Sequence, residues 1–272
     1  AASTYRCRPT ERSNCPDGSH YHSFLGRAPQ APAPFSVMPT VSLACNAMAT
    51  RFELVLYGDD EGRLRSAGEE AIREIKRIAN RFSFYDPASE LSQVNRAASD
   101  RPVRVSGELF DLLSLCQNIY QYSHGAFDPT VGPLLRAWGF TSGAPERPGE
   151  SELRGALNVT GFENVSLERS DNSVRFRVNG IELDLGGIAK GWALDECKIL
   201  LKDAGIDCAL LHGGTSSVLT IGGDSKGEPW RIGIEDPYKR ENPDESGEHP
   251  PWFTHCDLLG TALSVSAIHG KS

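Results

Sequence analysis

Apolar positions recur along this chain with two periods, and each period predicts a kind of element. Apolar residues three and four positions apart predict helices over 62–82, over 106–123 and directly after the glycines at 186–187. Alternating apolar and polar residues predict strands near 50–57, 208–212, 217–221, 230–235, 252–258 and 261–267. The segment 164–186 predicts β-structure interrupted by turns at 171–172 and 179–180, whereas 141–150 and 237–251 predict loops. Because helices alternate with hairpin-like strands, we expect a mixed α+β fold with antiparallel pairs rather than a doubly wound parallel sheet.

The helical stripes also predict which side chains are buried. The stripe over 62–82 consists of Leu64, Ala67, Ala71, Ile75, Ile78 and Phe82. Cys116 and Cys197 lie on predicted buried faces, where a free cysteine behaves as a small apolar residue. The seven cysteines form no CxxC pair and no cluster with metal-ligand spacing. This usage favours a reducing compartment over a disulfide framework, so we expect a cytoplasmic protein. The alternative is a periplasmic, membrane-anchored lipoprotein, if the native N-terminus differs.

Charge and patterning narrow the classes of function and the extent of the domain. The formal net charge of −8, with no basic stripe, argues against a nucleic-acid partner. No apolar run reaches the roughly 18 residues of a membrane-spanning helix. Residues 1–40 lack periodicity, and we expect them to be a disordered or non-native extension, with Met38 as the natural start. Residues 41–272 are then expected to form one domain.

The stretch 184–195 carries the clearest candidate chemistry. Ile181, Leu183 and Leu185 predict a short strand, after which Gly186 and Gly187 lead into a helix with Lys190 in its first turn. Glycines allow a ligand close to the backbone, and a helix N-terminus offers N–H groups to an anion. With Asp184 at the end of the strand, the arrangement suits a phosphate-bearing ligand and a divalent metal. A purely structural strand–turn–helix would use the same glycines, and the spacing matches neither a P-loop nor the dinucleotide fingerprint.

Six motifs in one order carry a family resemblance. They are Ala47 to Phe52, Phe82 to Leu91, Gly125 to Leu134, Asp184 to Gly191, Gly213-Gly214, and Trp230 to Pro237. Over residues 44–268 this series resembles the ApbE family of magnesium-dependent FAD:protein FMN transferases. The resemblance implies an ApbE-like fold of mixed and antiparallel sheets flanked by helices. It also implies an enzyme that binds FAD and Mg²⁺, cleaves the pyrophosphate, attaches FMN to a threonine or serine hydroxyl of an acceptor protein, and releases AMP.

The family's partners and alternatives follow from the same resemblance. The implied acceptors are flavoprotein subunits of respiratory or electron-transfer complexes. Two other activities stay open, namely Mg²⁺-dependent hydrolysis of FAD to FMN and AMP, and FAD binding without catalysis.

The family's site residues carry over by motif. The implied FAD contacts are Met48, Tyr85, Ala126, Phe127, Asp128, Asp184 and Lys190. The implied Mg²⁺ ligand is the main-chain carbonyl of Gly187. Ordinary core packing is the alternative for Met48 and Phe127, turn stabilisation for Asp128, and a solvated helix position for Lys190.

Two family features have no counterpart here. The family's other Mg²⁺ ligands lie in a later Asp-Ala-x-x-Thr segment, and a histidine precedes its Ile-Asp-Pro motif; neither occurs in this sequence. We therefore expect the C-terminal part of the domain to be missing, and no residue is assigned as a catalytic base. His269 stands in a different context, Ile-His-Gly-Lys, and is not assigned that role. The run Gly213 to Ser217 is either a cradle for phosphate or ribose, or a strand-to-strand turn.

Overall fold

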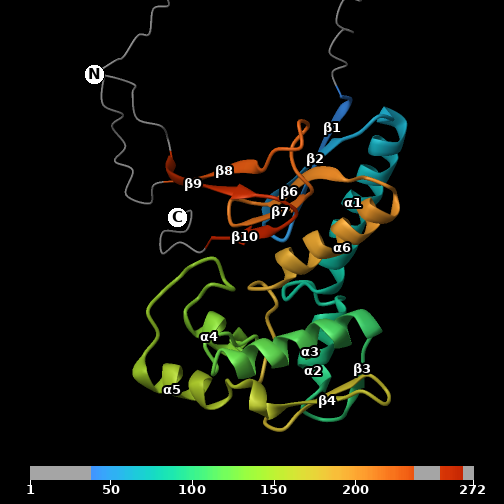
Figure 1. The fold of residues 1–272 in the computed structure, drawn as a ribbon. Helices are drawn as coiled ribbons and strands as arrows, with labels where there is room; N and C mark the ends of the chain where they lie inside the picture. The colour runs from blue at the N-terminus through green and yellow to red at the C-terminus, as the bar shows by residue number, and fades with distance from the viewer. Residues whose placement is uncertain (1–37, 236–251, 266–272) are drawn as a thin grey trace, which may run out of the picture. The chain divides into compact units, whose positions relative to one another are not determined.

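The computed structural model describes residues 38–235 and 252–265. Its largest sheet has five strands in the order β1-β2-β6-β7-β10, and all neighbouring pairs are antiparallel (Figure 1). These strands are β1 (Thr40–Ala47), β2 (Thr50–Tyr57), β6 (Cys208–Gly213), β7 (Ser217–Ile221) and β10 (Ala262–Ser264). Along β2, Phe52, Leu54 and Leu56 are fully buried and alternate with more exposed residues, as the period of two predicted.

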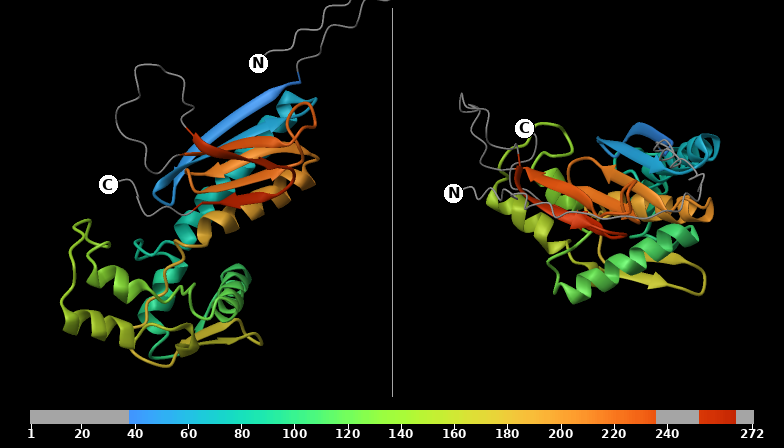
Figure 2. Two further views of the ribbon diagram at one scale, coloured as in Figure 1. Left: turned by 60° about the vertical axis from the view of Figure 1, so that its left-hand side comes forward. Right: turned by 45° about the horizontal axis from the view of Figure 1, so that its top comes forward.

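Two helices cover one face of this sheet. They are α1 (Glu61–Arg81) and α6 (Ala189–Asp203), which lie side by side in both views (Figures 1 and 2). The predicted stripe of α1 is buried, and Asp60 caps the helix by accepting a hydrogen bond from Arg63 N at 3.1 Å. Gly68 permits the close packing, since a Cβ there would lie 2.1 Å from Leu43 Cδ1. Cys197 is buried against α1, with its Sγ 3.5 Å from the carbonyl oxygen of Ala71.

The middle of the chain folds into helices around a small antiparallel sheet of order β3-β5-β4. The strands are β3 (Val103–Arg104), β4 (Val165–Glu168) and β5 (Ser173–Phe176), and the helices are α2 (Glu90–Ala97), α3 (Gly107–Tyr122), α4 (Gly132–Ala137) and α5 (Glu150–Asn158), with a 3₁₀ turn at Phe162–Asn164. The helix expected over 106–123 is confirmed as α3, and Cys116 is buried in it. Helices α2 and α5 were not expected, because each spans only about two turns.

The strand predicted over 181–185 is not formed, and this is the main local difference from the prediction. Ile181, Leu183 and Leu185 are buried in alternation as predicted, but the segment belongs to no sheet. Its backbone pairs with a loop instead: Asp184 N donates to Pro129 O at 2.7 Å, and Gly132 N donates to Glu182 O at 3.1 Å. The period of two reports burial on one side, and it cannot tell which backbone satisfies the hydrogen bonds.

Two further strands, β8 (Trp230–Glu235) and β9 (Trp252–Leu258), form a separate antiparallel pair. The predicted strands at 230–235 and 252–258 are thus confirmed, whereas the one predicted over 261–267 is described only as the shorter β10. The loop predicted at 237–251 and the extension predicted at 1–40 lie wholly or mostly outside the described residues, so those two predictions stay open. The expected mixed α+β class with antiparallel pairs is confirmed. Among the described helices, none is long and apolar enough to cross a membrane.

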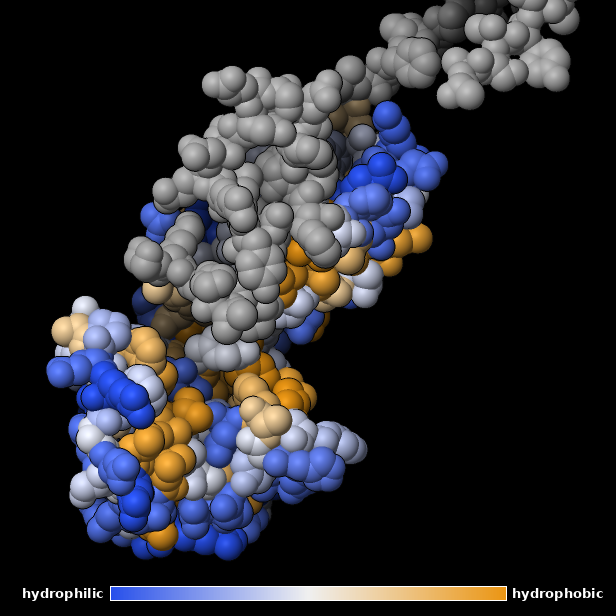
Figure 3. All heavy atoms as spheres, turned by 90° about the vertical axis from the view of Figure 1, so that its left-hand side faces the viewer, coloured by the Kyte–Doolittle hydropathy of each residue, from blue (hydrophilic) through white to orange (hydrophobic). Residues whose placement is uncertain are grey.

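Exposed apolar and polar residues are interspersed on the face of the described residues that Figure 3 shows. The apolar positions on this face lie as separate patches among polar ones. Large exposed apolar side chains include Trp138 and Phe140, which follow α4, and Leu157 within α5.

Candidate ligand-binding site

A cleft of about 690 Å³ collects residues from five separate segments. The β1–β2 turn contributes Met48 and Ala49, α1 contributes Lys76 and Asn80, and the α1–α2 loop contributes 82–86. Leu135 of α4 and the segment around Asp184 and Lys190 complete the lining. Of the residues predicted as FAD contacts, the cleft brings together Met48, Tyr85, Asp184 and Lys190.

The β1–β2 turn holds its two central residues in an unusual conformation. Met48 and Ala49 have φ of 50° and 55°, the left-handed values that a two-residue hairpin turn requires. Asn and Gly usually fill these positions, because other side chains are strained there. Met48 is half-buried against the core, so both readings of its role, packing and ligand contact, are compatible with its place. Backbone strain at a ligand cleft is a recurring feature of functional sites.

The loop 82–89 presents Tyr85 to the cleft. The Tyr85 side chain is 66% exposed, and its ring lies edge-on to Phe84 with centroids 5.4 Å apart. Ser83 Oγ accepts hydrogen bonds from Tyr85 N at 3.2 Å and Asp86 N at 3.0 Å. Ser89 Oγ donates to Ser83 O at 2.6 Å. These bonds fix the loop backbone while leaving the Tyr85 ring free to meet a planar ligand.

Asp184 lies at the cleft wall with a partly buried carboxyl group. Its Oδ1 accepts a hydrogen bond from Gly186 N at 2.8 Å. Burial raises the pKa of this carboxyl, and the Gly186 N–H opposes the shift without cancelling it. A carboxylate held in a poorly solvated place is stabilised by a cation, which is the character expected beside a metal ion.

The start of α6 supplies donors to the same wall. Ile188 N and Ala189 N both bond to Leu185 O, at 3.0 and 2.8 Å. Within the described residues the backbone N–H groups of Gly187, Lys190 and Gly191 have no backbone acceptor. Gly186 and Gly187 are exposed, so a ligand can approach these N–H groups.

A second hollow of about 510 Å³ adjoins the cleft across this turn. Gly186 and Lys190 line both spaces. The second space is also lined by Gly187 and Gly191, by Asp195 of α6, and by the hydroxyl-bearing residues Ser216, Ser217 and Ser264. The turn therefore forms a ridge between two hollows.

The structure places the Ala126-Phe127-Asp128 motif beside the ridge and outside the cleft lining. Phe127 is half-buried against the core, and its Cε2 lies 3.5 Å from where a Cβ on Gly187 would be. Asp128 Oδ1 accepts hydrogen bonds from Thr130 N at 2.8 Å and Thr130 Oγ1 at 2.7 Å. Asp128 thus stabilises the turn, which was its alternative reading, while Ala126 is exposed.

The run Gly213 to Ser217 comprises the last residue of β6, the turn at 214–216 and the first residue of β7. Gly214 has φ of 70°, and its N–H donates to Arg51 O at 2.9 Å. A Cβ on Gly214 would lie 2.3 Å from Thr50 Oγ1, so glycine is needed for this contact. The strand-to-strand turn is observed, and the end of the run, Ser216 and Ser217, lines the second hollow.

Sequence reasoning missed Lys76, Asn80, Phe84 and Leu135 as lining residues. Lys76 and Asn80 are exposed positions of an amphipathic helix, which the periodicity describes as an ordinary solvated face. Only their four-residue spacing, which puts both on one side of α1, hinted at a shared surface.

Comparison with known proteins identifies the family of this chain. A sequence model of the ApbE family matches residues 48–267. The chain belongs to the ApbE family. The FAD:protein FMN transferase of Vibrio cholerae is 32% identical over 170 residues, which are 61% of this chain and 49% of the relative. The FAD:protein FMN transferase of Rhodobacter capsulatus is 32% identical over 204 residues, which are 74% of this chain and 38% of the relative.

Solved ApbE structures share the fold. The ApbE protein from Thermotoga maritima superposes with a TM-score of 0.72 at 29% identity, covering 82% of this chain and 69% of that one. The flavin transferase ApbE from Vibrio cholerae gives a TM-score of 0.66 at 29% identity, covering 74% and 65%. The expected ApbE-like fold is confirmed. This ApbE-family chain spans about half the length of the curated relatives it matches, 49% and 38% of the two named above.

Proposed function

We propose that this ApbE-family chain binds FAD and transfers its FMN part to a threonine or serine hydroxyl of an acceptor flavoprotein, with release of AMP. The observation that carries the proposal is the cleft in which Met48, Tyr85, Asp184 and Lys190 line one space. Relatives named as FAD:protein FMN transferases support the choice of reaction.

The binding side of the proposal follows from the character of the lining. Tyr85 offers an exposed aromatic face, and Met48 offers a polarisable side chain, both suited to a flat isoalloxazine ring. Lys190, Lys76 and the free N–H groups of the glycine turn suit the negative pyrophosphate. Holding a flexible dinucleotide with its pyrophosphate at one fixed point is itself a large part of catalysis.

The residues at the ridge also fit a magnesium ion. Mg²⁺ takes oxygen ligands and keeps several waters while bridging phosphates, so it needs few protein groups. We assign the carbonyl of Gly187 as a ligand, and the exposed turn leaves it accessible. Within the described residues no three His, Cys, Asp or Glu side chains group as a closed metal site. Bound Mg²⁺ would neutralise charge on the pyrophosphate oxygens.

The acceptor we propose is a flavoprotein subunit of a respiratory or electron-transfer complex, as in the family. Hydrolysis of FAD to FMN and AMP, or binding without chemistry, are the competing outcomes. Transfer and hydrolysis both cleave the pyrophosphate and differ in what receives the FMN group, a protein hydroxyl or water, whereas binding alone leaves FAD intact.

A single incubation separates the three activities. The purified chain is mixed with FAD, Mg²⁺ and a candidate acceptor, and the products are resolved on a denaturing gel and by chromatography. Flavin fluorescence on the acceptor band with equimolar AMP supports transfer, and free FMN with AMP supports hydrolysis. Intact FAD bound to the chain supports binding alone. Failure to bind FAD at all with Mg²⁺ present would sink the proposal.

A further inference from the structure

An ion pair between Arg81 and Glu90 joins the two ends of loop 82–89, which carries Tyr85. We call this pair the neck of the loop. Arg81 is the last residue of α1, and Glu90 is the first residue of α2, so the pair brackets loop 82–89. Arg81 Nη2 donates to Glu90 Oε2 at 2.7 Å, and Arg81 Nε donates to the same oxygen at 3.2 Å. Both side chains are largely shielded, with 34% and 20% of their surfaces exposed. A partly buried ion pair joined by two hydrogen bonds keeps its geometry better than an exposed surface pair.

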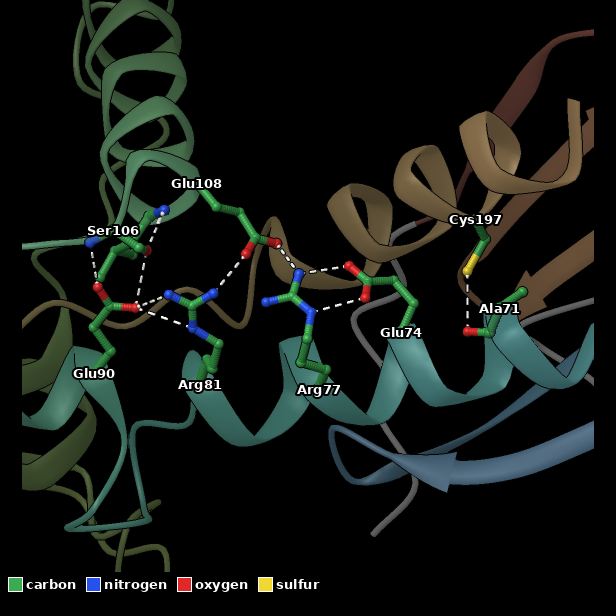
Figure 4. A network of polar contacts seen from close by, with 9 residues as sticks. Ala71, Glu74, Arg77, Arg81, Glu90, Ser106, Glu108 and Cys197 are labelled. Carbon is green, nitrogen blue, oxygen red and sulfur yellow. Dashed lines mark hydrogen bonds and ion pairs between the residues drawn. The ribbon is translucent and has the colours of Figure 1, made fainter. Parts of the chain in front are cut away.

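The neck is anchored to a third element, α3. Glu90 Oε2 accepts a hydrogen bond from Ser106 Oγ at 3.0 Å, and Ser106 is the N-cap of α3. Arg81 Nη1 donates to Glu108 Oε2 at 3.0 Å in the first turn of α3. The close view shows Arg81 between the two carboxylates (Figure 4). One guanidinium therefore joins the end of α1 to the starts of α2 and α3.

The network continues along α1 without touching the loop. Arg77 Nη2 donates to Glu108 Oε1 at 2.7 Å, and Arg77 Nε donates to Glu74 Oε2 at 2.7 Å (Figure 4). Burial alone would raise the pKa of Glu108, but the Arg77 hydrogen bond and the charges of Arg77 and Arg81 hold it below its ordinary value. Arg77 and Arg81 thus share a carboxylate and a helix, but only Arg81 closes the neck.

The neck bears on the cleft through a short path. Five consecutive residues of the loop, Phe82 to Asp86, line the cleft, and the Tyr85 ring is mostly exposed. The Ser83 hydroxyl that fixes Tyr85 N and Asp86 N lies two residues beyond Arg81. Ser89 Oγ also joins the two ends of the loop by donating to Ser83 O at 2.6 Å, so the ion pair reinforces the contact that fixes the backbone from which the ring projects.

We propose that Arg81 is a positioning residue for the flavin ring, closing loop 82–89 with Glu90 so that Tyr85 is held in place before FAD binds. The proposal rests on the proposed FAD site, and it assigns Arg81 no contact with the ligand. A pre-ordered ring avoids the free-energy loss of immobilising a side chain on binding.

The test is a double-mutant cycle on FAD affinity. Arg81→Met keeps the apolar stem and removes the guanidinium. Glu90 loses its cationic partner in this variant but keeps its hydrogen bond from Ser106, and Glu108 keeps its ion pair with Arg77. We expect Arg81→Met and Tyr85→Leu each to raise the Kd for FAD about tenfold, the order of one immobilised aromatic side chain. If Arg81 acts through Tyr85, the double variant also shows about a tenfold loss; a hundredfold, additive loss overturns the proposal.

Arg77→Met is the matched control, because it removes the other guanidinium from the same network. We expect it to lower thermal stability while leaving the Kd for FAD within about twofold of wild type. Equal losses of affinity in Arg77→Met and Arg81→Met would show that the network acts only through stability, against the proposal.

Hydrogen exchange without ligand separates this inference from the proposed function. The amides of Tyr85 and Asp86 are expected to exchange faster in Arg81→Met than in Arg77→Met. Unchanged exchange of these amides in Arg81→Met overturns the proposal that the neck holds the loop, even where FAD binds. If the wild-type chain binds no FAD, the proposed function fails, and the exchange result alone decides whether the neck holds the loop.

Discussion

The side-chain amide of Asn95 bonds both backbone groups of Leu183. Asn95 Nδ2 donates to Leu183 O at 3.0 Å, and Leu183 N donates to Asn95 Oδ1 at 2.8 Å. A single side chain from α2 thus takes the place of a neighbouring strand for the segment that leads to Asp184. The arrangement explains how 181–185 stays extended and buried without joining a sheet.

Removing the Asn95 side-chain amide should destabilise the segment 181–185, which leads to Asp184 in the cleft. Asn95→Ala leaves one partly buried donor and one acceptor of Leu183 unbonded, so we expect the free energy of unfolding to fall by about 1–3 kcal/mol. Urea denaturation measures it. Gln93→Ala, on the same helix, removes an exposed bond to Ala88 O and is expected to change stability by less than about 0.5 kcal/mol. Similar losses in both variants would contradict the role given to Asn95.

Asp184→Asn should separate stability from ligand binding. The raised pKa of Asp184 means that its contribution favours the folded state below the ordinary carboxyl pKa and is lost as pH rises through the raised value. Near neutral pH the buried charge is a cost. The variant keeps the acceptor for Gly186 N, and we expect it to be at least as stable as wild type there, with a weaker fall in stability on raising the pH from 4 to 7.

The same variant should bind FAD about tenfold more weakly when Mg²⁺ is present, the usual scale for groups that support a metal. Thermal unfolding across pH and titration with FAD measure the two effects. Asp203→Asn, an exposed change at the end of α6, is the control and should alter neither. A clear loss of stability in Asp184→Asn at pH 7 would count against a buried, costly charge.

Ala49→Gly should relieve the strain of the β1–β2 turn. Alanine at φ of 55° is disfavoured by about 1–2 kcal/mol relative to its right-handed form, whereas glycine is not. We expect a net gain of about 1 kcal/mol, because glycine is also freer in the unfolded chain. Asn172→Gly changes a residue with φ of 51° that tolerates this conformation, so its gain should be smaller. Differential scanning calorimetry of both variants decides the point.

Lys190→Met should weaken FAD binding through charge alone. A charge-assisted contact to phosphate is worth about 1.5–3 kcal/mol, so we expect the Kd to rise roughly 10- to 100-fold at low salt. The difference from wild type should shrink as salt is added, since screening weakens the lost attraction. Lys202→Met, which removes a pair with Asp207 at the far end of α6, should have no effect on the Kd. A salt-independent loss would indicate a packing role for Lys190.

The sequence predicted elements whose periodicity is long and whose partners are regular. The stripe from Leu64 to Phe82 is buried as expected, because an amphipathic helix against a sheet has only one way to hide its apolar face. Ile181 to Leu185 show the limit: their burial was predicted, but their hydrogen-bond partners, Asn95 and a loop, leave no periodic signal.

The candidate site divides in the same way. Met48, Tyr85, Asp184 and Lys190 were named from motifs, and the fold gathers them around one cleft. Lys76 and Leu135 were not named, because their positions depend on how α1 and α4 pack, which tertiary contacts decide. The neck pair Arg81–Glu90 was invisible for a related reason, since two charges nine residues apart read as solvated helix ends until the chain between them is seen to double back.

Because Gly186 and Lys190 line both hollows, the ridge belongs to neither alone. A ligand that occupied both hollows would contact Gly186 and Lys190 with both of its halves at once. The binding free energies of the two halves, measured with FMN and with AMP separately, should therefore not add up to the binding free energy of FAD. A substitution at Gly186 or Lys190 should change this difference more than it changes the binding free energy of either half.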